Sequence, residues 1–116
     1  MDLSYTDADG IRTIKLKGRM DLEGAAEIDL RFTSITSTER TYVIVDLSEV
    51  DFMASIGLAT LARSGKAVRL RQGNMVLFNP KPQVRQVLGS TKIDEVLHVY
   101  SDLEEAWIAV KAPLAG

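Results

Sequence analysis

Near the N-terminus, apolar and polar positions alternate in two short runs. Leu3–Thr6 alternates, Asp7–Gly10 has the composition of a turn, and Ile11–Leu16 alternates again. In the second run, Ile14 and Leu16 share one face, and polar residues share the other. A period of two is that of a β-strand, so these runs predict a hairpin with one buried face and one face in water.

Further segments carry apolar residues at spacings of three and four, which is the period of an amphipathic helix. We expect Asp21 to cap the first helix and Ser101–Glu104 to form a capping box before the last. The second helix covers about residues 55–72, and the third starts at Pro80 or Pro82. The predicted inward-facing residues are, helix by helix, Leu22, Ala25, Ile28, Phe32 and Ile35; Leu58, Leu61, Ala62, Gly65 and Val68; Val84, Val87 and Leu88; and Leu103, Trp107 and Val110.

Apolar runs separate these helices and complete the predicted fold. Val43–Leu47 and Met75–Phe78 are apolar without alternation, as expected of central strands covered on both faces. Val96–Tyr100 is predicted to be a last, short strand. The resulting order, β-β-α-β-α-β-α-β-α, predicts an α/β fold with a mixed, mostly parallel sheet of about five strands and about four helices. At 116 residues, the chain is long enough for one domain, spanning residues 1–116, with its own core.

The stretch Asp46–Leu58 joins the first central strand to the second helix. It ends in the small-residue turn Ala54–Gly57, and right-handed crossovers place this turn at the carboxyl end of a central strand. Partners and ligands of open α/β sheets commonly bind at that edge. The hydroxyl of Ser55 is expected beside the unpaired N–H groups of the first helical turn, where negative charge is favoured. Two roles for Ser55 stay open: the N-cap of the helix, or a residue that is modified or presented to a partner.

The face of the 55–72 helix that points away from the sheet also has an unusual composition. It carries apolar or small residues around one arginine, whereas a solvated face would be mostly charged. Small residues around an arginine suit close contact with another protein. We therefore predict a partner surface here, unless the 82–88 helix or a chain terminus covers it. The face carries Ile56, Ala59, Arg63, Ala67 and Leu70, and the predicted partner surface consists of Ile56, Ala59, Arg63 and Leu70.

Composition narrows the function classes. The chain has no cysteine, which excludes disulfides and thiolate metal sites. A net charge of −2 and a pI near 5.4 argue against nucleic acid as a partner. No apolar run approaches the roughly 18 residues of a membrane-spanning helix, and no signal peptide is evident, so we expect a cytoplasmic protein without membrane insertion.

The inventory of reactive side chains also argues against an enzyme. His98 is the single histidine, so the usual pair of nucleophile and base is difficult to build. Ser64–Ala67 partly resembles the end of a phosphate-binding loop, but Ala67 replaces the magnesium-binding Ser or Thr. The upstream glycine, Gly57, also has the wrong spacing, and the segment lies in a predicted helix. We interpret Asp46, Glu49 and Asp51 as solvated turn charges rather than a metal site. We expect no catalytic residue, no metal and no cofactor.

Two motifs resemble a known family. Asp51–Leu58, DFMASIGL, resembles the signature of STAS domains, and specifically of the stand-alone bacterial anti-sigma factor antagonists. Leu16–Asp21, LKGRMD, resembles the second motif of the family, a strand that leads into the first helix. The order of predicted elements matches over residues 3–111. The resemblance implies a STAS-like fold for essentially the whole chain.

The resemblance also implies a mechanism of partner switching. Ser55 falls on the serine that a cognate kinase phosphorylates in the family, and Asp21 falls on an acidic residue near the kinase contact. The unphosphorylated antagonist would bind an anti-sigma factor, often itself a serine kinase of histidine-kinase-like ATPase fold, and free a sigma factor. Phosphorylation would release the antagonist, and a PP2C-type phosphatase would reset it. The predicted partner-binding residues are Asp21, Met53, Ala54, Ser55, Ile56, Ala59, Arg63 and Leu70.

One position departs from the family pattern, and other functions stay open. Ala54 stands where members with well-defined switching often carry aspartate. A STAS subunit of a membrane transport system, or a small-ligand sensor module, would share the fold and would also lack a catalytic set. Neighbouring genes for a transporter, or for a phosphatase and an ATPase-fold kinase, would separate these functions. We expect the free protein to be a monomer.

Overall fold

The computed structural model describes residues 1–37 and 42–112. Within them, the elements follow the predicted order with one added 3₁₀ turn, η1, before the last strand. They are β1 (Asp2–Ala8), β2 (Ile11–Met20), α1 (Leu22–Thr36), β3 (Tyr42–Met53), α2 (Ser55–Leu70), β4 (Asn74–Phe78), α3 (Pro82–Ser90), η1 (Ile93–Glu95), β5 (Val99–Tyr100) and α4 (Leu103–Lys111). The predicted α/β class is confirmed.

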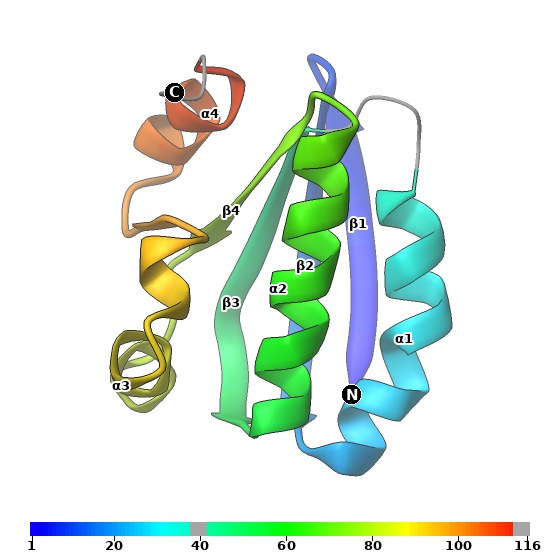
Figure 1. Ribbon diagram of the computed structural model, residues 1–116, viewed down its shortest axis with the longest axis vertical. Coiled ribbons are helices and arrows are strands. Elements are labelled where there is room, and N and C mark those ends of the chain that lie inside the picture. The colour runs from blue at the N-terminus through cyan, green and yellow to red at the C-terminus, as the bar shows by residue number, and fades with distance from the viewer. Residues whose placement is uncertain (38–41, 113–116) are drawn as a thin grey trace.

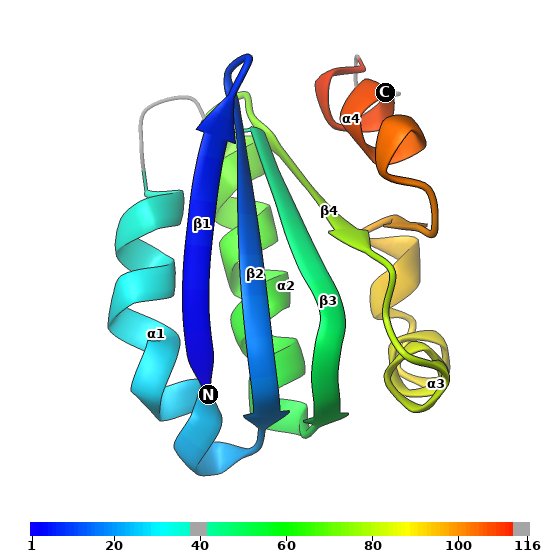
Figure 2. The same ribbon diagram turned by 180° about the vertical axis from the view of Figure 1, so that it is seen from behind.

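The described strands form one five-stranded sheet in the order β1-β2-β3-β4-β5. β1 pairs antiparallel with β2, and the other neighbours pair in parallel. Each right-handed crossover moves one strand in the same direction, so α1, α2 and α3 fall on one face of the sheet. Figures 1 and 2 show α1 and α2 side by side over that face, and α4 packs on the other face near β4.

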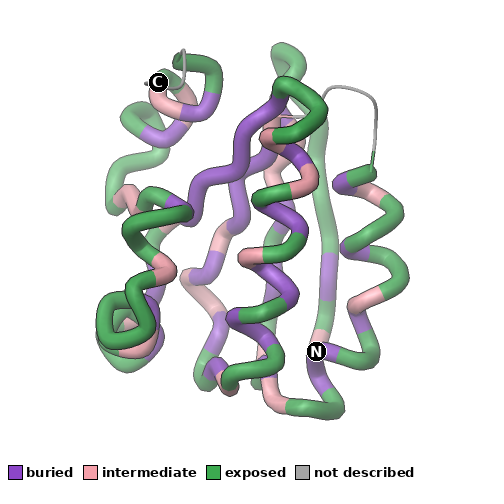
Figure 3. The backbone as a smooth tube through the Cα atoms, viewed as in Figure 1, coloured by how far each residue is buried: buried purple, intermediate pink, exposed green. Residues whose placement is uncertain are grey.

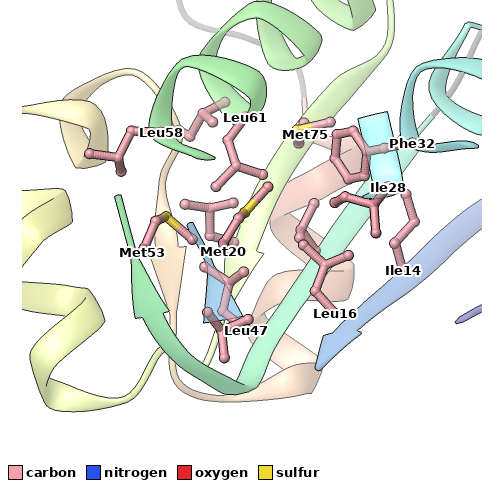
Figure 4. Packing of buried hydrophobic residues seen from close by; sticks show 14 of the residues in the cluster. Ile14, Leu16, Met20, Ile28, Phe32, Leu47, Met53, Leu58, Leu61 and Met75 are labelled. Carbon is pink, nitrogen blue, oxygen red and sulfur yellow. The ribbon is translucent and has the colours of Figure 1, made fainter. Parts of the chain in front are cut away.

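Hydrophobic clusters lie on both faces of the sheet. Val43 and Val45 face the larger cluster under α1, α2 and α3, whereas Ile44 faces the smaller cluster under α4. All three residues are 0 % exposed, which confirms the two-sided burial predicted for this strand. Figure 3 shows that buried residues gather along the central strands, whereas much of the helix surface is exposed. Figure 4 shows the larger cluster from close by, with Met20 and Leu61 among its members.

The N-terminal hairpin pairs as predicted, with Leu3 opposite Leu16. Arg12 connects this hairpin to the last turn of α1. Its guanidinium carbon lies 4.5 Å from the centroid of the Tyr5 ring, and its Nη1 donates a hydrogen bond of 2.8 Å to the carbonyl of Ile35. A cation is favoured at this end of a helix because the last carbonyl groups are otherwise unpaired.

β3 is longer than the sequence pattern predicts. The pattern places its end at Leu47, whereas the strand continues to Met53 alongside β2. Register shifts near Lys17 and Arg19 place extra β3 residues opposite β2. Such bulges interrupt the alternation of side chains, so this part of the strand has the sequence pattern of a turn.

The three carboxylates predicted to be turn charges therefore lie along β3. Glu49 is 3.5 Å from the ammonium group of Lys15, Asp51 pairs with Lys81 near the start of α3, and Asp46 accepts a backbone N–H. Across residues 1–37 and 42–112, no group of His, Asp and Glu side chains is arranged to hold a metal ion.

The last strand is shorter than predicted. Only Val99 and Tyr100 pair with β4, and the residues before them form η1 and an irregular segment. In that segment, Leu97 is fully buried against Gly65 of α2. A Cβ atom on Gly65 would lie only 2.4 Å from Leu97 Cδ2, so the absence of a side chain there leaves room for Leu97. Burial of Leu97, rather than strand pairing, accounts for its apolar character.

Helix faces agree with the prediction apart from some helix ends. Leu22 is 71 % exposed and Leu103 is 45 % exposed, so neither belongs to the core. Asp102, and not Ser101, caps α4, because its Oδ1 accepts the N–H of Glu104 at 2.8 Å. Leu22 and Leu103 are each the first residue of their helix.

Candidate partner-binding site

The carboxyl ends of β2 and β3 bring the starts of α1 and α2 together. Met20 is opposite Met53 in the parallel register, and the N–H of Ala54 donates to the carbonyl of Met20 at 3.0 Å. Asp21 follows Met20 and Ser55 follows Ala54, so both predicted site residues lie at the same edge of the sheet. Figure 4 shows Met20 and Met53 beneath the first turns of α2, where they anchor this edge.

Ser55 is the first residue of α2 and is exposed. The N-cap is Ala54, and no side chain caps this helix. The interpretation of Ser55 as a capping serine is therefore wrong. Its hydroxyl lies outside the helix hydrogen-bonding pattern, at a helix end where unpaired N–H groups favour negative charge.

Glycines allow both helices to start close to β2. A Cβ atom on Gly57 would lie 2.7 Å from Met20 Cγ and 3.2 Å from the Met20 carbonyl oxygen. A Cβ atom on Gly24 would lie 1.9 Å from the carbonyl oxygen of Arg19. No local pattern in the sequence indicates the role of Gly24, because that role depends on a contact between distant elements.

Asp21 caps α1, as predicted. Its Oδ1 accepts the N–H of Gly24 at 2.8 Å. This hydrogen bond, with a smaller contribution from Arg19, holds the pKa of the Asp21 carboxyl below its ordinary value. The carboxylate is therefore charged at neutral pH and remains partly accessible beside the start of α2.

An arginine and an aromatic ring also lie beside Asp21, and neither is among the predicted site residues. The guanidinium carbon of Arg19 lies 4.4 Å from the centroid of the Phe52 ring, and its Nε is 3.6 Å from Asp21 Oδ2. Phe52 is 39 % exposed, so this stacked pair belongs to the surface of the site. The β2–β3 register brings the two residues together, and no spacing in the sequence indicates that register.

The remaining predicted residues separate into one buried anchor and an exposed stripe. Met53 is 3 % exposed, so the prediction that its side chain contacts a partner is corrected: it packs in the core. Ala54 is half-buried. Along α2, Ile56 is 41 % and Leu70 is 79 % exposed, and neither α3 nor another described segment covers them. The exposed stripe consists of Ile56, Ala59, Arg63 and Leu70, with Ala67 half-buried beside it.

α1 and α2 enclose a groove that begins beside Ser55. It has a volume of about 400 Å³ and is lined by Leu22, Ala25, Ala26 and Asp29 of α1 and by Ile56, Thr60 and Arg63 of α2. Arg63 Nη2 is 3.2 Å from Asp29 Oδ1, which links the two helices across the groove.

No helix in the described part of the chain is both long and apolar enough to cross a membrane.

A family model for the STAS domain matches residues 3–106 of this chain. The chain belongs to the STAS domain family. BtrV of Bordetella bronchiseptica, provisionally named an anti-sigma factor antagonist, is 27 % identical over 114 residues, covering 98 % of both chains. The anti-sigma-F factor antagonist RsfB of Mycobacterium tuberculosis is 24 % identical over 112 residues, covering 94 % of this chain and 88 % of RsfB.

Solved STAS structures share the fold. An anti-sigma factor antagonist from Mycobacterium paratuberculosis superposes with a TM-score of 0.83 at 23 % identity, covering 96 % of this chain and 94 % of that one. Unphosphorylated SpoIIAA superposes with a TM-score of 0.74 at 19 % identity, covering 98 % of this chain and 100 % of that one. The murine anion transporter Slc26a9 also matches, with a TM-score of 0.76 at 17 % identity, over 93 % of this chain and 19 % of the transporter. The STAS fold therefore serves proteins of different function, and residues of the site must carry the functional argument.

Proposed function

We propose that this STAS protein is an anti-sigma factor antagonist whose binding to its anti-sigma factor is controlled by phosphorylation of Ser55. The unphosphorylated form binds the anti-sigma factor, which is a serine kinase of histidine-kinase-like ATPase fold, and frees a sigma factor or another target. A PP2C-type phosphatase reverses the modification. In this scheme the protein has no catalytic activity of its own.

The observation that carries the proposal is the exposed Ser55 hydroxyl, uncommitted to helix capping, within the DFMASIGL motif. A kinase needs a hydroxyl that it can reach, and the buried Met53 fixes the turn that presents it. The names of the relatives BtrV and RsfB support the assignment as an antagonist. SpoIIAA, which shares the fold, has been solved in phosphorylated and unphosphorylated forms.

The local chemistry is compatible with a phosphate on Ser55. A phosphoserine carries about −1.5 to −2 charges at pH 7, and the N-terminus of a helix favours negative charge. Ala54 adds no carboxylate that would repel the phosphate. The modification therefore leaves the fold intact and acts on the partner, through repulsion and the cost of burying the new charge. A loss of about 1.4 kcal/mol in binding free energy weakens binding tenfold.

The proposed partner surface extends from the sheet edge along α2. At the edge it includes Asp21, Ala54 and Ser55, and along the helix it follows the exposed stripe of Ile56, Ala59, Arg63 and Leu70. Met53 supports this surface from below rather than forming part of it.

Titration calorimetry with the individually purified ATPase-fold anti-sigma factors of the source organism tests the proposal. We expect Ser55→Ala to bind like the wild type and Ser55→Asp to bind at least about tenfold more weakly. The matched control is Ser101→Asp, which places the same charge on an exposed serine before α4, on the opposite face of the sheet. Urea unfolding should show Ser55→Asp within about 0.5 kcal/mol of the wild type.

Mapping the modification gives an independent test. After incubation with the cognate kinase and ATP, mass spectrometry should assign the phosphate to Ser55. A phosphate on Ser90 or Thr91 instead, or equal affinity of Ser55→Asp and the wild type, would contradict the proposed switch.

A further inference from the structure

Exposed apolar side chains concentrate on the layer formed by α1 and α2. Leu22 and Leu30 of α1 are 71 % and 83 % exposed, and Ile56 and Leu70 of α2 are 41 % and 79 % exposed. Single exposed leucines are common on protein surfaces, but Leu22 and Ile56 lie on either side of a groove, where a partner could bury both of them. Of these four side chains, only Leu22 and Ile56 line the groove.

Small residues on the facing sides of the two helices keep the groove open. Its floor contains Ala25 and Thr60, each 2 % exposed, and Ala26 lies on its α1 side. The exposed rims are Leu22 and Ile56, which immediately follow Asp21 and Ser55 in the sequence. A molecule that places an apolar side chain in this groove is therefore close enough to reach Ser55 as well.

The charges around the groove specify the kind of molecule. α2 carries Arg63, Lys66 and Arg69 but no Asp or Glu, although the whole chain has a net charge of −2. Arg63 pairs with Asp29 while its side chain stays 64 % exposed. Within the described residues, Lys66 forms no ion pair and is exposed. The surface of α2 is thus locally basic, whereas α1 on the other side of the groove carries Glu23, Glu27 and Asp29. Carboxylates of a partner are therefore complemented on the α2 side of the groove only.

We propose that the α1–α2 groove receives an apolar side chain from an amphipathic helix of the anti-sigma factor, and that carboxylates on this helix lie over the basic surface of α2. The inference rests on the proposed function, since the occupant belongs to the partner that Ser55 controls. A helix laid into a groove anchors through apolar residues at spacings of three and four, and a groove of this size holds such an anchor. Binding then has two parts, the phosphorylatable edge and the groove.

The first experiment compares two leucines of α1. Leu22→Ala removes a side chain that lines the groove. Leu30→Ala is the matched control, because Leu30 is also largely exposed on the same helix but does not line the groove. The probe is the anti-sigma factor that binds the wild type in calorimetry. We expect Leu22→Ala to weaken binding about tenfold and Leu30→Ala to change it less than about twofold. Ala26→Trp, which fills the groove from its exposed rim, should weaken binding at least as much as Leu22→Ala.

The second experiment tests the charges. Lys66→Glu should weaken binding about fivefold at low salt and less at high salt, whereas Lys17→Glu, on the strand β2, should leave the affinity unchanged. Ser55→Asp is measured in parallel to separate the two proposals. If Ser55→Asp weakens binding while Leu22→Ala and Ala26→Trp bind like the wild type, the groove proposal is overturned and the proposed function stands.

Other occupants would produce different results. If Leu22→Ala changed the sedimentation mass of the protein alone, the groove would bind a second copy of this chain, and the proposal would be overturned. If no ATPase-fold anti-sigma factor bound the wild type, both the proposed function and the groove proposal would fail.

Discussion

The contact between Gly24 and β2 makes a strong prediction about the start of α1. In Gly24→Ala, the new Cβ atom would lie 1.9 Å from the backbone oxygen of Arg19, whereas real Cβ contacts stay above 3.0 Å. The two groups must therefore separate by at least 1.1 Å, the difference between these distances. Arg19 cannot move freely because it is paired with Phe52 in the sheet, so α1 must move away. That movement would stretch the 2.8 Å hydrogen bond from Gly24 to Asp21.

The magnitude follows from two opposing effects. Alanine is preferred over glycine within a helix by about 0.8–1.0 kcal/mol, and overpacking of a tight contact costs about 1–3 kcal/mol, to which the stretched cap adds. We expect a net destabilisation of about 1–3 kcal/mol. For a domain of this size, about 4 °C of melting temperature corresponds to 1 kcal/mol, so Gly24→Ala should lower the melting temperature by about 4–12 °C.

Gly89→Ala is the matched control for this prediction. Gly89 also lies in a helix, but the nearest atom to its new Cβ would be Asp94 Oδ2, at an ordinary contact distance of 3.6 Å. Only the helix preference then acts, and Gly89→Ala should gain about 0.5–1 kcal/mol. Urea unfolding followed by circular dichroism measures both variants. If Gly24→Ala were as stable as the wild type or more stable, the close approach of α1 to β2 would be wrong.

Two further predictions concern the core and the response to acid. Phe32 is 0 % exposed, so Phe32→Ala should lower the free energy of unfolding in urea by about 3–5 kcal/mol. Leu30 is exposed, so Leu30→Ala should stay within about 0.5 kcal/mol of the wild type. Similar losses in the two variants would contradict the assigned core. Hydrogen bonds lower the pKa values of three carboxyl groups: Asp7 accepts from Arg12, Asp21 from Gly24, and Asp51 from Lys81. The stability that these carboxylates contribute is present above the ordinary carboxyl pKa near 3.9. It is lost as the pH falls through the lowered pKa values. The free energy of unfolding, measured between about pH 7 and pH 2, should decline below about pH 4. The decline should be less steep in Asp51→Asn. An identical decline in that variant would contradict the assigned pairing of Asp51 with Lys81.

Local patterns in the sequence predict the parts of the fold that depend on neighbouring residues. Asp21 caps α1 because its side chain reaches an N–H three residues ahead, which is a contact that sequence spacing alone specifies. The inward stripe containing Ile28 and Phe32 follows from the helical period in the same way. The α/β class follows from the order of such elements.

Contacts between distant segments account for the errors. The bulged end of β3 has no regular alternation, and only its pairing with β2 makes it a strand. Leu97 lies in an apolar run typical of a strand, but it is buried against Gly65, in the distant helix α2. The stacking of Arg19 on Phe52 likewise depends on the register between two strands. A single sequence contains no direct signal for any of these contacts.

The turn before α2 is anchored in the core while the Ser55 hydroxyl is exposed, so we expect the site to tolerate a modification without a change of fold. Met20 and Met53 are buried at the ends of adjacent strands, and the Ala54 N–H is bonded to Met20, so the core holds the turn in place. Ser55 extends from this anchored turn into solvent and contributes neither a cap nor a core contact. We therefore expect a charge added there to change the free energy of unfolding little and to act on whatever approaches the surface of α2. This division between a fixed turn and an uncommitted hydroxyl is what a binding switch requires, because its two states must differ in affinity while both stay folded.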